Sequence, residues 1–579
     1  MQSQENNVAR RLVEMAGRFP DQVAIAVPLR VRSVGEGKNA KRRYETITFR
    51  EFDELTDKIA HALIDQGVRP GMRLALMTRH GIDFIALVYA IFKSGAAIVM
   101  VDPGMGMRRM LDCLAEAEPD GFAAIPPVHV VRCLLWKRFP KAKHNLTVGR
   151  LGAAGAIRWL WGGLSLEKIK RQPHRGSCHQ RNKSVLVEVE PDTPTAIIFT
   201  SGSTGVPKGV LYTHRIVDTQ VAEIAGRFDI QPGIVDVAGF PFFGLFNPAM
   251  GVTMVIPDMD PTQPAKVKPE NILEAVADWN ALQSFGSPAL WHRVADHCIE
   301  RGLVIESLKR VVLAGAPISV HLLAKLKRCL TDDANIYTPY GATESLPVAV
   351  IEANEVLNET AAQTNIGRGI CVGKRFSQID WRVIRITDEP IARLEDAEIL
   401  PVGEIGELTV TGPQVTQRYV TRVEANAYAK MTDSQGRIWH RIGDVGWLDT
   451  TDRFWFCGRK AHRVETAAGP MFTDPCEAIF NMHPDVYRSA LVGASATSAI
   501  TGTFGEQTSV IYIEPKPGKF PKTEAAKSQL TQELLALGKA NPLTERIDTI
   551  RFLKTFPVDV RHNAKINREL IAEWEAERK

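Results

Sequence analysis

The stretch Thr200-Ser201-Gly202-Ser203-Thr204-Gly205-Val206-Pro207-Lys208-Gly209 decides the interpretation of this chain of 579 residues. It directly follows the apolar run Thr195–Phe199, whose sequence predicts a buried strand. Glycines allow a tight turn in which successive N–H groups point into one concavity, and such a concavity binds anions. Four hydroxyl groups and one ammonium group add donors, so the stretch predicts a polyphosphate site rather than an ordinary surface loop. No Gly-Lys-Ser/Thr tripeptide ends it, which argues against a P-loop NTPase.

This loop resembles the phosphate-binding signature of the adenylate-forming superfamily. Members of that superfamily include acyl-CoA synthetases, the adenylation domains of peptide synthetases and beetle-type luciferases. They activate a carboxylate with ATP and form an acyl-adenylate and pyrophosphate. The resemblance implies that the residues binding the ATP phosphates are Thr200, Ser201, Gly202, Ser203, Thr204, Gly205 and Lys208.

The segment before the loop alternates helical and strand patterns. Strands are expected at Thr46–Thr48, within Val68–Met77 and at Ala96–Val101, and helices at Phe49–Gln66 and Gly81–Ser94. This βαβ rhythm predicts an α/β fold. The resemblance implies a large N-terminal AMP-binding domain of βαβ-type sheets, residues 1–458, and a smaller mobile α+β domain, residues 459–579.

Two later motifs follow in the order that the superfamily shows. Val311–Ile318 predicts a buried strand and a turn at Gly315-Ala316-Pro317, which the resemblance places against adenine. In Tyr340-Gly341-Ala342-Thr343-Glu344 the glycine permits a tight turn, the tyrosine can stack on a purine and the threonine can donate to the α-phosphate. Glu344 is the candidate ligand of Mg²⁺, which prefers carboxylate and phosphate oxygens. A strand end and a helix cap explain the same residues without a ligand.

The C-terminal half supplies the remaining motifs. In Arg441-Ile442-Gly443-Asp444 the carboxylate can accept both ribose hydroxyls, and Arg459 matches the second ribose contact of the superfamily. Lys460 falls at the hinge position between the domains. Lys565, followed by Arg568 and Leu570, resembles the lysine of the last motif and is assigned to adenylation, where its ammonium group stabilises the developing charge.

Several departures from the common pattern occur together. Gly244 stands where many acyl-CoA synthetases carry histidine, and the aromatic side chains of Phe242, Phe243 and Phe246 surround it as a candidate acyl pocket. Asn563-Ala564 replaces the usual Ser-Gly before the lysine. Together with the sequence of residues 101–107, these departures resemble the bacterial olefin-biosynthesis β-lactone synthetases. That resemblance implies a substrate of the class of long-chain 2-alkyl-3-hydroxy acids, with ATP and Mg²⁺, and lactone closure without coenzyme A.

A basic insertion, residues 126–184, precedes the phosphate loop. Between Arg132 and Lys183 it holds thirteen Lys/Arg and one acidic residue, Glu167, together with Trp136, Trp159 and Trp161. Three interpretations stay open: a solvated loop, a membrane-surface or lipid-handling segment, and a docking site for partner enzymes of a hydrocarbon pathway.

Composition narrows the class of protein. The net charge of +5 is too small to indicate a nucleic-acid partner for the whole chain, and no segment reads as a signal peptide. Eight cysteines without a CxxC pair favour a reducing cytoplasm over a disulfide framework or a zinc site. His174, Cys178 and His179 are accordingly interpreted as solvated loop residues.

Three functional hypotheses follow. The first is an ATP-dependent β-lactone synthetase, the second a long-chain acyl-CoA or acyl-AMP ligase, and the third an inactive nucleotide-binding scaffold. The base that takes the substrate's hydroxyl proton has no assigned residue. His214 is available, but its pattern favours a polar strand-end histidine.

Overall fold

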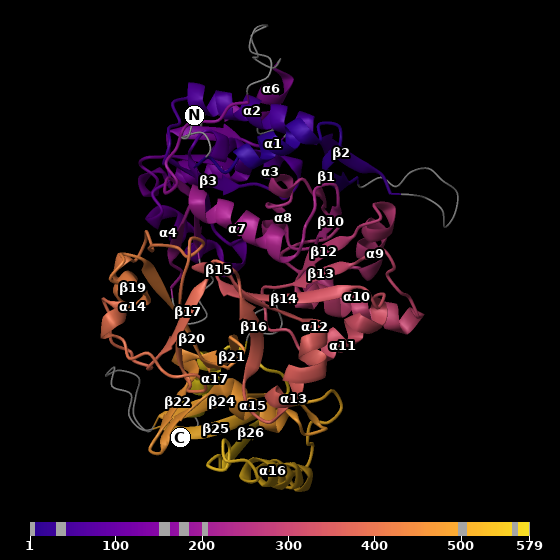
Figure 1. Ribbon diagram of the computed structural model, residues 1–579, viewed down its shortest axis with the longest axis vertical. Helices are drawn as coiled ribbons and strands as arrows, with labels where there is room; N and C mark the ends of the chain where they lie inside the picture. The colour runs from indigo at the N-terminus through magenta and orange to yellow at the C-terminus, as the bar shows by residue number, and fades with distance from the viewer. Residues whose placement is uncertain are drawn as a thin grey trace.

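The computed structural model describes residues 6–29, 42–149, 162–172, 184–199, 206–495, 507–558 and 566–577. Its sheets stack along the long axis of the molecule, with the N-terminal elements at one end and the C-terminal elements at the other (Figure 1). The α/β fold expected from the sequence is confirmed.

The N-terminal end is built on a seven-stranded sheet of order β7-β6-β5-β3-β4-β8-β9. All neighbouring strands are parallel except the last pair, β8 and β9. The strands are β3 (Arg73–Met77), β4 (Ala97–Met100), β5 (Gly121–Ala124), β6 (His144–Thr147), β7 (Leu164–Ser165), β8 (Pro194–Phe199) and β9 (Gly209–Thr213).

A second, fourteen-stranded sheet crosses the middle of the molecule. It is parallel from β11 through β10, β12 and β13 to β14, and antiparallel from β14 onward. Its strands are β1 (Val23–Pro28), β2 (Tyr44–Thr48), β10 (Val235–Ala238), β11 (Thr253–Val255), β12 (Gln283–Gly286), β13 (Arg310–Leu313), β14 (Asn335–Ala342), β15 (Ser345–Glu352), β16 (Ile370–Arg375), β17 (Asp380–Ile384), β18 (Gly406–Thr411), β19 (Lys430–Thr432), β20 (Ile438–Leu448) and β21 (Arg453–Arg459).

The C-terminal region forms its own small sheets. These are the hairpin of β22 (Val464–Thr466) with β23 (Gly469–Met471), and the sheet of β24 (Val486–Ser495), β25 (Gln507–Pro515) and β26 (Thr549–Phe552). A hydrophobic cluster of its own joins them to α15 (Thr473–Asn481) and α16 (Glu524–Lys539). The boundary between residues 458 and 459 stays a prediction.

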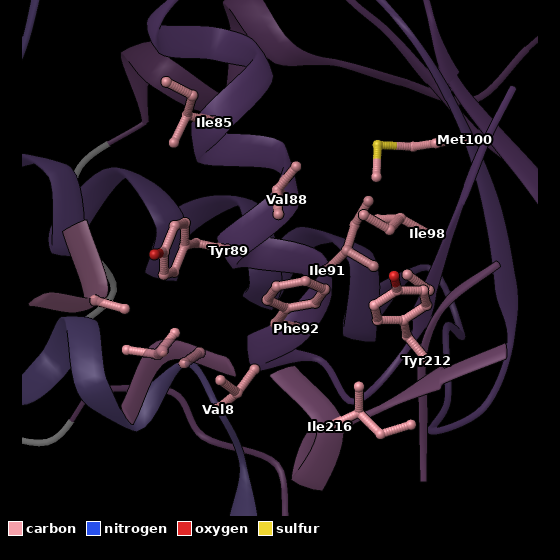
Figure 2. Packing of buried hydrophobic residues seen from close by; sticks show 14 of the residues in the cluster. Val8, Ile85, Val88, Tyr89, Ile91, Phe92, Ile98, Met100, Tyr212 and Ile216 are labelled. Carbon is pink, nitrogen blue, oxygen red and sulfur yellow. The ribbon is translucent and has the colours of Figure 1, made fainter. Parts of the chain in front are cut away.

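The helices cover these sheets, and one of them is enclosed. In α3 every residue from Phe84 to Lys93 is buried, as expected for a helix that is apolar all round. Figure 2 shows its Val88 and Phe92 packed near Ile98 of β4 and Ile216 of α7. Besides α15 and α16, the other described helices of eight or more residues are α1 (Arg10–Arg18), α2 (Phe49–Asp65), α4 (Met107–Glu116), α5 (Pro126–Leu134), α7 (His214–Arg227), α9 (Pro269–Asp278), α10 (Pro288–Arg301), α11 (Val320–Cys329) and α17 (Arg568–Ala576).

The local signals of the sequence explain the helix limits. Thr48 and Glu51 form a capping box at the start of α2, with each side chain accepting the other residue's N–H, at 2.9 and 3.3 Å. Gly67 has φ of +96°, a left-handed conformation that glycine adopts without strain, and it ends the helix. The predicted helix at Phe49–Gln66 is therefore observed almost unchanged.

The described part of the basic insertion is regular structure rather than loop. Residues 126–149 and 162–172 contribute α5, the strand β6, the edge strand β7, and α6 (Leu166–Arg171), which packs on α2. The interpretation as a solvated loop is wrong for these residues, because backbone pairing with β5 and burial of Leu166 and Ile169 hold them in the sheet. Trp159, Trp161, Cys178, His174 and His179 lie outside the described residues. No helix of the described ranges is long and apolar enough to cross a membrane.

A buried histidine links the N-terminus to α7. The Val8 N–H donates to Nδ1 of His214 at 3.1 Å, and the ring is fully buried. Burial lowers the pKa of His214 to about 4. The ring is therefore neutral and accepts a hydrogen bond, which fits the interpretation of His214 as a polar residue with a structural role at the end of a strand.

We expect the stability of the protein to fall as the pH drops from 6.5 to about 4. The unfolded chain protonates this histidine near its ordinary pKa of 6.5 while the folded chain does not, so the stability is complete above that value and lost below it. The loss is about 3 kcal/mol for this group. Melting temperatures across this range should show a weaker pH dependence in His214→Gln, and an unchanged dependence would contradict the expectation.

Candidate active site

One large cavity lies between the two large sheets and receives side chains from both. Its volume of about 2120 Å³ is more than twice the upper limit of the range usual for small-molecule sites, roughly 300–1,000 Å³. The space therefore suits two ligands, or one ligand of unusual size.

The polar end of the cavity lies where β13 and β14 end. Gly315 has φ of +97° and turns the chain directly after β13, with Ala316 and Pro317 also lining the cavity. A Cβ on Gly341 would approach the Ser345 carbonyl oxygen to 2.7 Å, so only glycine fits. These positions present backbone and the Tyr340 ring to the cavity, a surface suited to a flat heterocycle.

Asp444 connects β14 to the β20–β21 hairpin. It is directly paired with Arg459 across the two strands, and the guanidinium group forms an ion pair with its carboxylate. Tyr340 donates its hydroxyl to Asp444 Oδ2 at 2.5 Å. The Asp444 charge raises the pKa of Arg459, which keeps the guanidinium charged. Three residues that the sequence placed in separate motifs thus form one contact.

Glu344 is held by a tyrosine and a threonine that the sequence motifs did not include. Tyr419 donates its hydroxyl to Glu344 Oε1 at 2.7 Å. The backbone N–H and hydroxyl of Thr416 both donate to the Glu344 carbonyl oxygen at 2.9 Å. The neighbouring Thr343 carbonyl accepts the Tyr212 hydroxyl at 2.7 Å. The carboxylate is therefore fixed in position before any ligand binds.

Two lysines lie beside the ring of Tyr419. The Lys208 ammonium is 5.0 Å and the Lys430 ammonium 5.8 Å from the ring centroid. Lys430 also donates to the Thr416 carbonyl and, at 3.2 Å, to its hydroxyl. Burial lowers the pKa of Lys430 to about 7. In the sequence, the only indication that Lys430 belongs to the site is that this lysine interrupts the mostly apolar stretch of residues 425–431.

The other end of the cavity is aromatic. Phe243 and Phe246 of the candidate acyl pocket line it together with Phe240 and Phe285. Phe243 stacks on Phe285 with ring centroids 4.1 Å apart. The side chain of Phe242 lies outside the described residues.

Gly244 faces the strands beneath it. A Cβ there would lie 2.3 Å from the Met254 side chain and 3.1 Å from Ala238, both in the strands beneath. Close packing of the segment on the sheet therefore explains this glycine.

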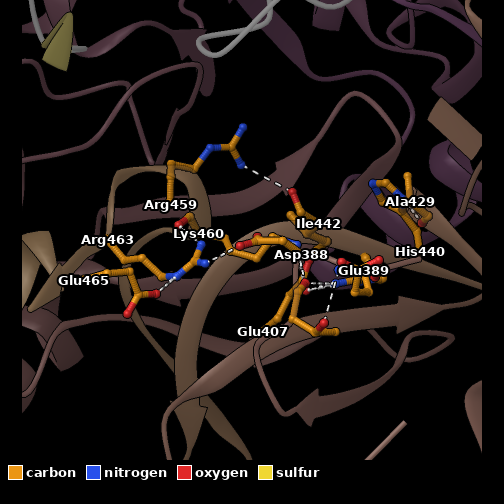
Figure 3. Close-up of polar contacts among 12 residues, drawn as sticks. Asp388, Glu389, Glu407, Ala429, His440, Ile442, Arg459, Lys460, Arg463 and Glu465 are labelled. Carbon is orange, nitrogen blue, oxygen red and sulfur yellow. Dashed lines mark hydrogen bonds and ion pairs between the residues drawn. The ribbon is translucent and has the colours of Figure 1, made fainter. Parts of the chain in front are cut away.

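Ionic contacts surround the candidate hinge. Lys460 donates to Glu407 at 3.2 Å (Figure 3). It also donates to the Thr387 carbonyl at 3.0 Å, and Glu407 is the buried partner of Arg441. Arg459 also reaches the Ile442 carbonyl oxygen at 3.4 Å. These contacts fix the chain at the start of the C-terminal region, and the hinge role of Lys460 stays a prediction.

Two predicted elements, the loop residues 200–205 and Lys565, lie outside the described residues. Their described neighbours reach the cavity: Lys208 lines it, as do Val558 and Ile566, which form an antiparallel bridge. Arg568 also lines it and makes two hydrogen bonds of 2.7 Å to Glu477. The described residues next to the loop 200–205 and next to Lys565 therefore line the same cavity.

In the ranges that the structure describes, no three His, Cys, Asp or Glu side chains gather to hold a metal ion. A single fixed carboxylate beside lysines is instead the arrangement expected where a cation is shared with phosphate oxygens.

Comparisons with known proteins agree with this geometry. Residues 12–420 match the family model described as AMP-binding enzyme. The chain is 42% identical to the olefin beta-lactone synthetase of Xanthomonas campestris pv. campestris, over 99% of this chain and 98% of the relative. It is 41% identical to the protein of the same name from Stenotrophomonas maltophilia, over 98% of each.

Among solved structures, the amide bond synthetase McbA from Marinactinospora thermotolerans superimposes with a TM-score of 0.74 at 19% identity, covering 98% of this chain and 99% of that chain. This likeness concerns the fold, whereas the family match and the identities concern the sequence itself. The chain therefore belongs to the AMP-binding enzyme family of adenylate-forming enzymes.

Proposed function

We propose that this chain converts long-chain 2-alkyl-3-hydroxy acids to β-lactones with ATP in olefin biosynthesis. The observation that carries the proposal is the 42% identity to an olefin beta-lactone synthetase over nearly the whole of both chains. The first step joins the substrate carboxylate to the α-phosphate and releases pyrophosphate. In the second, the substrate's 3-hydroxyl oxygen attacks the activated carbonyl carbon, loses its proton and displaces AMP.

The polar end of the cavity fits ATP. Gly315, Ala316 and Pro317 would lie against adenine with the Tyr340 ring, and Asp444 with Arg459 would hold the ribose hydroxyls. A carboxylate already paired with an arginine and a tyrosine hydroxyl is charged and oriented before the ribose arrives. The residues of the loop 200–205 and Lys208 would hold the phosphates.

The residues around Glu344 fit Mg²⁺. Glu344 lines the cavity, and the Tyr419 hydroxyl donates to Oε1 and fixes the position of the carboxylate. A bound Mg²⁺ would neutralise phosphate charge and orient the leaving pyrophosphate. Thr343 would donate to the α-phosphate, and Lys565 would stabilise the charge that shifts between the two reacting groups.

The apolar part of the cavity would hold the alkyl chains. A volume of about 2120 Å³ exceeds what a nucleotide site alone requires, and aromatic residues line the far end. With the acid held there, its hydroxyl is tethered next to the activated carbonyl group. Closure therefore avoids the entropic cost of bringing a second substrate, and coenzyme A is not needed.

Two features of the structure bear on the cellular compartment of the enzyme and on what its surface contacts. Six described cysteines, at positions 113, 298, 329, 371, 457 and 476, are free thiols, which supports a cytoplasmic protein. Leu134 and Trp136 of the basic insertion are 76% and 64% exposed beside Lys137, which supports contact of this region with a membrane surface or a partner enzyme.

The proposed first step is tested by pyrophosphate release. Purified protein with Mg²⁺-ATP should release pyrophosphate when a long-chain 2-alkyl-3-hydroxy acid is added and coenzyme A is absent. Strict dependence on coenzyme A would favour an acyl-CoA ligase instead, and no release with any acid would favour an inactive scaffold.

We expect Tyr419→Phe to raise the Mg²⁺ concentration needed for half-maximal activity about tenfold, because it removes a hydrogen bond to a charged group. Magnesium titrations of pyrophosphate release measure this effect. Tyr487→Phe, at an exposed tyrosine of the C-terminal region, is the matched control. An unchanged magnesium requirement in Tyr419→Phe would show that Tyr419 does not set the position of Glu344.

A further inference from the structure

A row of polar residues crosses the sheet beneath the aromatic end of the cavity. Asp236 of β10 is in register with Gln283 of β12, and Gln283 with Arg310 of β13. The Arg310 guanidinium donates to Gln283 Oε1 at 3.0 Å. All three stand at the amino-terminal ends of their strands, opposite the edge where the nucleotide residues lie.

The next row on the same face is apolar. Two residues further along the strands, Ala238, Phe285, Val312 and Tyr337 are in register. Strand geometry places this row about 7 Å above the polar row. On this face of the sheet a polar row of side chains is therefore followed directly by an apolar row. The register of the strands fixes the position of the boundary between the two rows.

Asp236 is buried and incompletely bonded. It is 1% exposed and lines the cavity, as do Asn247 and Gln283. Its Oδ2 accepts the Asn247 side-chain N–H at 2.7 Å. The Gln283 side chain and the Phe285 backbone N–H also stabilise the carboxylate, although in the described ranges Oδ1 has no partner in full hydrogen-bond geometry. Burial raises the pKa of Asp236 to about 6. Covering this carboxyl group with methylene groups would remove its remaining access to a polar partner, which is unfavourable.

We propose that Asp236, with Gln283 beside it, forms the floor of the acyl cavity and sets the length of the alkyl chain that the enzyme accepts. This inference rests on the proposed function only in taking the substrate to be a long-chain acid. The chain lies along the apolar row and ends where Asp236 begins. From Arg310 to Leu313 the strand rises about 10 Å, so the polar row lies about that far below the turn expected to contact the nucleotide.

The test is a chain-length series in which either alkyl chain of the acid is varied two carbons at a time. Asp236→Ala should move the optimum of kcat/KM for pyrophosphate release to longer chains by about two methylene groups, with about a fourfold gain for each newly buried methylene. Asp236→Asn keeps the volume and the polarity and should leave the optimum unchanged. Val312→Leu, one row above, should move the optimum to shorter chains.

A second readout does not need turnover. Each acid should raise the melting temperature of the protein with the same dependence on chain length as the reaction shows. If pyrophosphate release fails for every acid, the proposed function fails, whereas the melting series still locates the floor. An unchanged optimum in folded Asp236→Ala and Val312→Leu would overturn the inference.

Discussion

Replacing Lys565 with alanine is expected to lower the rate of acid-dependent pyrophosphate release about 10²- to 10³-fold, the usual loss when one preorganised group that stabilises developing charge is removed. The described residues on both sides of Lys565, Val558 and Ile566, line the cavity. This supports the proposal that the ammonium group of Lys565 acts on the carboxylate and the α-phosphate. Initial rates at saturating acid and ATP measure the effect.

A matched control separates the loss of charge from loss of fold. Lys554→Ala, at an exposed lysine of the same region, should keep the full rate and the melting temperature of the unchanged protein. If Lys565 serves only adenylation, Lys565→Ala supplied with synthetic acyl-adenylate should still form product. Full pyrophosphate release by Lys565→Ala would remove this lysine from the mechanism.

Replacing Asp444 with asparagine is expected to reduce kcat/KM for ATP by about 10²- to 10³-fold. The substitution leaves the shape of the side chain and removes the charge that pairs with Arg459. The ribose loses its charged acceptor, and each hydrogen bond to a charged group is worth about 1.5–3 kcal/mol. Steady-state kinetics with ATP varied should place most of the effect in KM, because the ribose does not react.

The control for Asp444→Asn is Asp332→Asn, at an exposed carboxylate on the surface. It should bind ATP as the unchanged protein does. A variant Asp444→Asn that keeps the ATP affinity of the unchanged protein would show that the ribose lies elsewhere and would move the nucleotide away from Tyr340.

Local sequence signals were sufficient for the elements that hold the site. The capping box of Thr48 with Glu51, the apolar run before Gly95 and the glycines at 67 and 315 all act within a few residues, so the strands and helices could be predicted from them. Motifs shared with a known superfamily supplied Tyr340, Asp444 and Arg459, and the structure brings these three together.

The contacts that the sequence did not reveal join residues far apart in the chain. Tyr419 is 75 positions from Glu344, and the row Asp236–Gln283–Arg310 exists only once three strands are aligned. The insertion was misjudged for a related reason. Its high charge suggested a solvated loop, whereas pairing of β6 with β5 and burial of Leu166 depend on a sheet that charge patterns do not describe.

The most direct test of the central claim is identification of the product by NMR, which avoids thermal decay of a strained ring. Purified protein, Mg²⁺-ATP and a synthetic long-chain 2-alkyl-3-hydroxy acid are mixed without coenzyme A. We predict a β-lactone and AMP in equal amounts. Release of AMP only after coenzyme A is added, with a thioester as the product, would contradict the account.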